Sequence, residues 1–247
     1  MIHFFRKIRQ QLLSKGKFSS YLLYALGEIA LVMIGILLAL QVNNWNSERI
    51  QRNEINAKYE RLSAELTSTS NLVQQKATYL DSIIVSKNKR SLALLRLKNE
   101  DSIHLLYNSL RAITNVVTVG YDMPATTEFL EAGYISSIDN DELKQLLLAL
   151  KRSISFGVIV DDYAKTQLNT LIEPYVINHI NYAEMVKGRS MTVVNPTQDY
   201  SVFFNDLQLE NILNLKIEAD GTKIDYLNTF NNILKRTASV ISSELEK

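Results

Sequence analysis

The fold is decided by one stretch of sequence, YLLYALGEIALVMIGILLALQVNNWN, which runs from Tyr21 to Asn46. Between Ser19 and Val42 the only charged residue is Glu28. A helix of about 24 residues is about 36 Å long, whereas the hydrocarbon core of a bilayer is about 30 Å thick. The stretch therefore predicts a transmembrane helix over residues 19–43 with a glutamate inside it.

Two other interpretations of this stretch are a cleaved signal peptide and a helix buried in a soluble core. A cleaved peptide usually has a shorter apolar region, followed by small residues at a cleavage site. Here the apolar run continues through LLALQVNNWN without a small-x-small site. An uncleaved signal anchor is therefore the favoured interpretation.

The flanks of the stretch predict its orientation. Basic residues gather before it, whereas the residues that follow it are nearly balanced in charge. The positive-inside rule then places residues 1–18 in the cytoplasm and residues 44–247 in the periplasm. Trp45 suits the outer interface as an anchor, and Tyr21 and Tyr24 suit the inner one. The membrane-surface basic residues are Arg6, Lys7, Arg9, Lys15 and Lys17.

The first 18 residues also predict a basic amphipathic segment. Their apolar residues fall on one helical face, which indicates a short helix lying on the anionic inner leaflet. The alternative is a disordered basic tail.

The composition of the whole chain limits what the rest can be. With 46% hydrophobic and 21% charged residues, the chain is expected to fold. It has only 8 Gly and 3 Pro, which favours long helices, and its lack of cysteine excludes disulfides and thiolate metal sites. The net charge is +1, with +4 in residues 1–42, so the remainder is mildly acidic and lacks the basic face of a nucleic-acid binder.

The predicted fold is all-α, with the transmembrane helix running into a long helix over residues 44–88. An apolar stripe marks this helix, either as an amphipathic helix that packs on its own domain or as a stalk that pairs with another protomer. The remaining chain predicts an antiparallel bundle of about four to six helices. The stripe contains Ile55, Tyr59, Leu62, Leu66, Val73, Leu80 and Ile83, and it is interrupted by Thr69 and Lys76.

Caps and breakers place the later helices. One should open at Asp101-Ser102, and another should begin at Pro124 and end at Gly133. Asp139 or Asn140 should cap a third, which would kink at Gly157 and stop near Pro174. Two more helices are expected, over residues 201–216 and 222–246. The β-branched segments 115–120 and 191–194 could pair as strands, although loops are favoured.

The sequence contains few residue patterns that indicate catalysis, metal binding or ligand binding. The three histidines have no metal-binding spacing, and no nucleophile elbow or phosphate-binding glycine loop occurs, so neither a metal nor a cofactor is predicted. The acidic cluster Asp139, Asp141 and Glu142 is interpreted as helix capping, and Asp161-Asp162 as a solvated helix face. Tyr175 and Tyr182 could line a ligand pocket, but tyrosines at helical spacing more often serve packing.

Glu28 belongs to a face of the predicted transmembrane helix. At 100° per residue Glu28 aligns with small residues that let two helices approach closely. Glu28 could lie near the inner headgroups within reach of Lys15 or Lys17, bond across a homo-oligomeric interface, or carry protons beside a channel-forming partner. This predicted contact face contains Tyr21, Tyr24, Glu28, Gly35 and Ala39.

The block FFRKIRQQLLSKGKFSSYLLYALGEIALVMIGILLALQVNNWN resembles an uncharacterised family of single-pass membrane proteins of Bacteroidota. The shared pattern is F-R-K-I-R followed by Y-x-x-Y-A-x-G-E-I-x-L-V-x-I-G-I-L-x-A-L-x-V-N-x-W-N. A weaker similarity covers TTEFLEAGYISSIDNDELKQLL, residues 126–147. The resemblance implies a bacterial inner-membrane protein with a periplasmic helical domain, and it implies no activity.

These observations predict a non-enzymatic scaffold or interaction protein, bound to the lipid bilayer, that assembles as a homo-oligomer or with a membrane-protein partner. Two alternatives are a ligand-sensing periplasmic module that acts through a partner, and an accessory subunit of an ion-driven complex that uses Glu28.

Overall fold

The computed structural model describes residues 18–185 and 198–246. Every regular element in these residues is helical, so the all-α prediction is confirmed. Residues 115–120 form no strand in the described part of the chain, and their suggested partner, Met191–Val194, lies outside it. The chain divides into two compact units, Met1–Ala57 and Lys58–Lys247, which we call the N-terminal unit and the C-terminal unit.

The N-terminal unit contains the first part of helix α2, Phe18–Tyr79. Its apolar side chains are open to the surroundings, as the 70% exposure of Leu31 and the 60% exposure of Leu37 illustrate. Among the described residues, one helix, Ala25–Leu97, is long and apolar enough to cross a membrane, and none of the 18 residues of its apolar window is buried. The expectation of an unbroken helix beyond residue 43 is confirmed.

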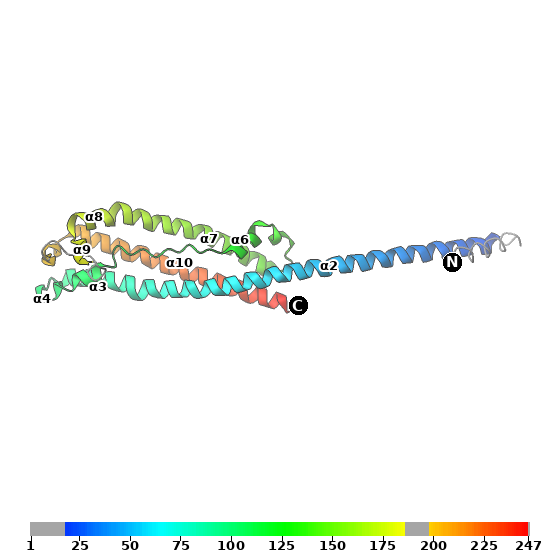
Figure 1. Cartoon of the computed structure of the whole chain (residues 1–247), viewed down its shortest axis with the longest axis horizontal. Helices are drawn as coiled ribbons and strands as arrows, with labels where there is room; N and C mark the ends of the chain where they lie inside the picture. The colour runs from blue at the N-terminus through cyan, green and yellow to red at the C-terminus, as the bar shows by residue number, and fades with distance from the viewer. Residues whose placement is uncertain (1–17, 186–197, 247) are drawn as a thin grey trace. The chain divides into compact units, whose positions relative to one another are not determined.

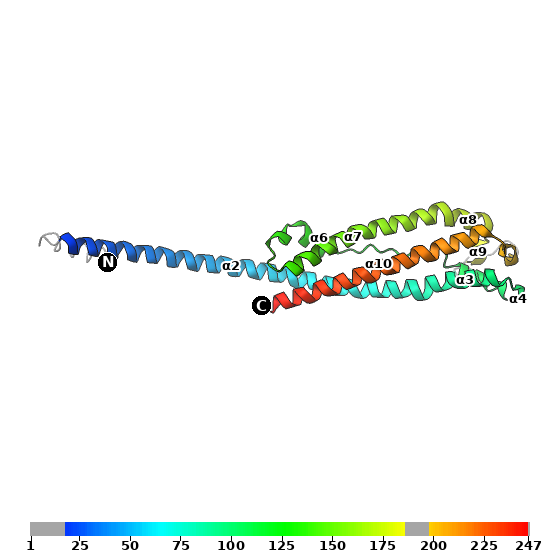
Figure 2. The same ribbon diagram turned by 180° about the vertical axis from the view of Figure 1, so that it is seen from behind.

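The C-terminal unit is built on three long helical stretches (Figures 1 and 2). Helix α10 packs against α7 on one side and against α3 and the turn η1 on another. Both views show α10 running in the opposite direction to α7 and α3. The stretches are the end of α2 with η1 Leu80–Val85 and α3 Ser86–Leu97; α7 Asp141–Gln167 with η3 Leu168–Ile172 and α8 Glu173–His179; and α10 Leu207–Leu245.

Because α3 and α7 run in the same direction, the chain must return along the unit between them. Residues 115–123 make this return as a drawn-out segment without regular structure (Figure 1). The short helices of the unit are α4 Glu100–Ile103, α5 Leu106–Leu110, α6 Pro124–Glu131, η2 Tyr134–Ser137, α9 Tyr182–Met185 and η4 Tyr200–Phe203.

Several predicted helix ends are confirmed by the structure. Helix α6 begins with Pro124, and Gly133 follows it in the left-handed region at φ 78°, where a side chain would be strained. Asn140 caps α7 by accepting from the Leu143 N–H at 3.1 Å. The predicted cap at Asp101-Ser102 is wrong, because Asn99 caps α4 by accepting from the Asp101 N–H at 2.9 Å.

Two predicted breaks are also wrong. The third helix does not stop near Pro174, because the π-helical turn η3 precedes this residue and places it in the first turn of α8, where a missing N–H costs little. The predicted helices 201–216 and 222–246 are not separated over residues 217–221, because α10 is continuous there. Asp206 caps α10 by accepting from the Leu209 N–H at 2.9 Å.

The core of the C-terminal unit uses the predicted stripe of α2. Tyr59, Leu62, Leu66, Val73 and Leu80 are buried within the chain, so this helix packs on its own unit, which is the first of the two interpretations of the stripe. Beyond Leu80 the stripe shifts by one position, because the π-helical turn η1 buries Ile84 and leaves Ile83 39% exposed.

Candidate functional site: charged side chains around an extended segment

The predicted transmembrane face lies on α2. Gly35 and Ala39 are one helical turn apart, and a Cβ atom at Gly35 would meet nothing within 4 Å. Glu28 is half-buried and takes part in a polar interaction. Tyr21 and Tyr24 also belong to α2, but their side chains lie outside the described part of the structure.

The expected membrane-surface groups are only partly described. Trp45 is 62% exposed, and the guanidinium of Arg49 lies 5.7 Å from the centre of its ring. The basic residues Arg6, Lys7, Arg9, Lys15 and Lys17 lie outside the described residues.

The largest departure from the sequence-based prediction concerns Asp161. It was expected on a solvated helix face, but only 8% of the residue is exposed. Its carboxylate accepts from the Val119 N–H at 2.9 Å and from the Gly120 N–H at 3.0 Å. The neighbouring Asp162 does face solvent, so the prediction holds for one residue of the pair.

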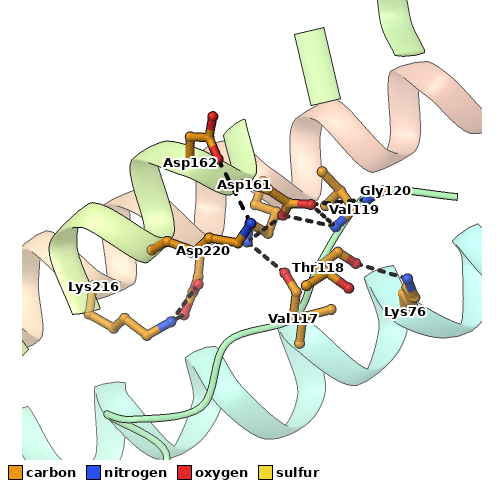
Figure 3. Close-up of polar contacts among 11 residues, drawn as sticks. Lys76, Val117, Thr118, Val119, Gly120, Asp161, Asp162, Lys216 and Asp220 are labelled. Carbon is orange, nitrogen blue, oxygen red and sulfur yellow. Dashed lines mark hydrogen bonds and ion pairs between the residues drawn. The ribbon is translucent and has the colours of Figure 1, made fainter. Parts of the chain in front are cut away.

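We call residues 115–123 the strap. Four consecutive strap residues each present one main-chain atom to a charged side chain, and the three charged residues come from three different helices (Figure 3). Lys76 of α2 donates to the Thr118 carbonyl at 2.9 Å, and Lys223 of α10 donates to the Val117 carbonyl at 2.6 Å. Asp161 of α7 accepts from the next two N–H groups. The strap is therefore held by charge-assisted bonds to its backbone.

Apolar contacts accompany these bonds. Val119 and Met123 are buried at 1% and 4% exposure. The ring of Tyr121 stacks on Phe230 of α10 with centroids 5.9 Å apart, and the ammonium of Lys76 lies 4.3 Å from the Tyr121 centroid. Burial raises the pKa of Tyr121. The strap therefore lies at the surface of the unit with Val119 and Met123 turned inward, whereas Asn115, Thr118, Gly120 and Asp122 are exposed.

Two ion pairs lie behind the strap. Lys223 lies 3.5 Å from Asp161, and Lys216 lies 2.7 Å from Asp220. The four side chains are between 2% and 11% exposed. Burial raises the pKa of Asp220 and lowers the pKa of Lys223, and in each case the opposite charges nearby work against that shift. Two positive and two negative groups balance, which is the condition for keeping charges in a low-dielectric interior.

The sequence does contain a signal for this cluster. Residues at alternating spacings of three and four form one stripe along α10, and its charged members are as buried as its leucines. The prediction of two helices, 201–216 and 222–246, interrupted this stripe between Lys216 and Lys223. The stripe is Leu209, Leu213, Lys216, Asp220, Lys223, Leu227, Phe230 and Leu234.

A separate cavity lies at the start of α10. It has a volume of about 560 Å³, and Tyr175, His179, Leu171, Ile212 and Leu215 are among its lining residues. The Tyr175 hydroxyl donates to Asp206 at 2.7 Å, and its ring stacks on His179 at 4.7 Å. Tyr175 therefore borders a pocket, as one interpretation of the sequence suggested, whereas Tyr182 is not among the residues that line it.

Two members of the predicted acidic cluster, Glu142 and Asp141, form ion pairs, one with α10 and one within α7. Glu142 accepts from the Arg236 Nε at 2.8 Å, and Asp141 lies 3.6 Å from Lys144. Within the described ranges, no group of three or more histidine, aspartate and glutamate residues is placed to hold a metal ion.

Comparison of the chain with protein-family models, curated proteins and solved structures gives no match.

Proposed function

We propose that the chain is a non-enzymatic, single-pass protein of a bacterial inner membrane, similar to the Bacteroidota family described above. Residues 19–43 anchor it, and residues 44–247 form an antiparallel bundle of about four to six helices that scaffolds partners in the periplasm. The observation that carries this proposal is the unburied apolar window of α2. Exposing one leucine to water costs about 1.5–3 kcal/mol, so a whole window of them favours lipid or partner helices.

The proposed orientation rests on the flanking charges. Five basic residues precede the span and would remain on the cytoplasmic side. Trp45, beyond the other end, has the amphipathic ring that suits the outer interface, and it is exposed on α2.

The proposed mode of assembly uses one face of the span. Gly35 and Ala39 form a small-xxx-small pair, and the open space at Gly35 would let a second helix approach closely. An ionisable residue at membrane depth favours protein surroundings over lipid, and Glu28 lies on the same face.

Cysteine crosslinking tests this assembly, because the chain has no cysteine of its own. We expect Gly35→Cys and Ala39→Cys to give disulfide-linked dimers in native membranes. Leu37→Cys, on the opposite face of the helix, is the matched control and should stay monomeric. Equal crosslinking at all three positions, or none at positions 35 and 39, would contradict the proposed interface.

A second candidate function is ligand sensing, which the cavity at Tyr175 favours. Its volume falls within the range of small-molecule pockets, and its lining combines leucines with amide, hydroxyl and imidazole groups. A compound library should contain molecules that raise the melting temperature of the full chain in lipid nanodiscs. The variant Asn211→Trp, which fills the cavity, should abolish that shift; a shift that persists would place binding elsewhere.

A further inference from the structure

We propose that the groove between α2, α7 and α10 is a binding site for an extended peptide, and that the strap, residues 115–123, occupies it in this chain. The proposal concerns the C-terminal unit alone and does not depend on how the chain is anchored.

The groove contacts the backbone of the strap through charged side chains. Lys76, Asp161 and Lys223 contact main-chain oxygen or nitrogen atoms of residues 117–120. These atoms are common to all peptides, so the contacts do not depend on the strap's own side chains. Proteins that bind peptides by strand addition draw affinity from the same main-chain groups. Here charged side chains take the place of a sheet edge.

Removal of the strap would leave buried charged groups of the groove without some of their hydrogen-bond partners. Without the strap, Asp161 would lose its bonds to the Val119 and Gly120 N–H groups, and Lys223 would lose the Val117 carbonyl. Buried charged groups that lose hydrogen-bond partners are strongly unfavourable. The charges therefore make an empty groove unstable and favour its filling by any backbone that restores those bonds.

The side chains of the strap indicate which peptides the groove would select. Val119 is almost fully buried, so the groove favours a β-branched residue of similar size at this position. Tyr121 lies between Phe230 and the Lys76 ammonium, which favours an aromatic residue two positions later. Gly120 is not required sterically, because a Cβ atom there would lie 3.7 Å from Asp161 in ordinary contact. The expected ligand is an extended segment with the pattern β-branched, any residue, aromatic.

One consequence is autoinhibition. The strap is covalently attached, so its effective concentration at the groove is high, and a partner peptide competes only when the strap leaves. The wild-type groove should consequently bind a peptide in trans far more weakly than a groove whose own strap has been replaced.

Peptide complementation tests the proposal in the full chain reconstituted in nanodiscs. In the receptor variant, Val119 and Gly120 are replaced by proline, which removes both N–H donors to Asp161, and Tyr121 is replaced by serine. The probe is a fluorescein-labelled peptide of residues 115–123, NVVTVGYDM. The control peptide carries N-methyl groups on the nitrogens of Val119 and Gly120, which removes both donors to Asp161.

We expect saturable binding of the unmodified peptide, at least tenfold weaker binding of the methylated peptide, and at least tenfold weaker binding to the wild-type chain. A folded receptor variant that binds neither peptide, or both equally, would overturn the proposal.

Hydrogen exchange of the wild-type chain keeps the proposal testable if the receptor variant fails to fold. The Val119 and Gly120 amides should exchange through a local opening, at least tenfold faster than the buried amides around Leu227 of α10. Exchange of the strap at the same rate as α10, with the same denaturant dependence, would show that the strap leaves only on global unfolding and would overturn the proposal.

Discussion

The two units of the chain differ in which side chains they expose and which they bury. In the N-terminal unit, apolar side chains such as Leu31 are exposed, and no residue of the apolar window is buried. In the C-terminal unit, the ionisable side chains of Lys216, Asp220 and Lys223 lie among leucines and are almost fully buried. A uniformly apolar segment can be recognised from composition alone. The burial of a single charge depends in addition on its partner, which lies one turn away on α10 for Lys216 and on α7 for Lys223.

Charges placed in the apolar window should give the largest effect. The double variant Val32→Arg and Leu37→Arg should lose membrane retention in carbonate-washed fractions, since each arginine at the centre of a span costs about 2.5–3.5 kcal/mol. Val202→Arg is the matched control, because Val202 is 64% exposed in the C-terminal unit, and it should stay with the membrane. Full retention of the double variant in the washed membranes would contradict the proposal that the apolar window holds the chain in the membrane.

Removing one buried charge should have the next largest effect. Asp220→Ala leaves Lys216 buried without its partner at 2.7 Å, so the free energy of unfolding should fall by about 3–5 kcal/mol. Asp162→Ala breaks a solvent-exposed pair with Lys165 at 3.8 Å and should cost no more than about 1 kcal/mol. Chemical denaturation measures both, and equal losses would mean that the buried pair behaves as a surface pair.

Substitution of alanine for Gly157 and for Gly221 should change the free energy of unfolding in opposite directions. At Gly157 a Cβ atom would lie 2.5 Å from the Tyr226 hydroxyl, so Gly157→Ala should lower the free energy of unfolding by about 1–3 kcal/mol. At Gly221 a Cβ atom meets nothing within 4 Å, so Gly221→Ala should raise it by about 0.5–1 kcal/mol. Thermal unfolding of the two variants provides the measurement, and stabilisation by both would show that Tyr226 moves aside freely.

The smallest effect concerns alkaline pH. Burial raises the pKa of Tyr226 to about 12 from an ordinary value of 10.0. The folded state therefore keeps a proton that the unfolded state loses, so the stabilising contribution is full below pH 10 and declines as the pH rises toward 12. The fall in stability between pH 9 and 11 should be smaller in Tyr226→Phe by about 1 kcal/mol, after allowance for solvent screening.

The pKa of Lys223 is lowered, so its contribution to the free energy of unfolding changes with pH in the opposite direction to that of Tyr226. Because wild type and Tyr226→Phe share this contribution, it cancels when their pH profiles are compared. An identical pH profile for wild type and Tyr226→Phe would show that the Tyr226 hydroxyl titrates as if it were exposed.

Local rules were sufficient to predict much of the fold. The all-helical class, the left-handed Gly133 and the Asn140 cap follow from interactions within a few residues, and the structure confirms them. The stripe on α2 was also predictable, because a helix buries every third or fourth residue. The predicted transmembrane face with Glu28, Gly35 and Ala39 stays a prediction.

The charged site could not be predicted in the same way. Asp161 becomes a buried acceptor because the strap, about 40 residues earlier, brings two N–H groups to it. Asp161, unlike Asp162, continues the buried stripe of Leu143, Leu147, Leu150 and Gly157 along α7, but this position does not reveal which N–H groups reach it. The burial of Lys216, Asp220 and Lys223 was readable in part, since they continue the stripe of α10, but only once α10 is known to pass through Gly221. Lys216 and Asp220 pair with each other one turn apart on α10. Lys223 pairs with Asp161 of α7, and a local pattern does not reveal this partner.

Cysteine accessibility is a direct check of the proposal that residues 19–43 lie in a bilayer and residues 44–247 lie on its periplasmic side. Single variants Leu37→Cys and Glu48→Cys would be treated with a membrane-impermeant maleimide added to the periplasmic face of intact spheroplasts. We expect rapid labelling of Glu48→Cys and labelling of Leu37→Cys only after detergent is added. Equal labelling of both positions without detergent, or protection of Glu48→Cys, would contradict it.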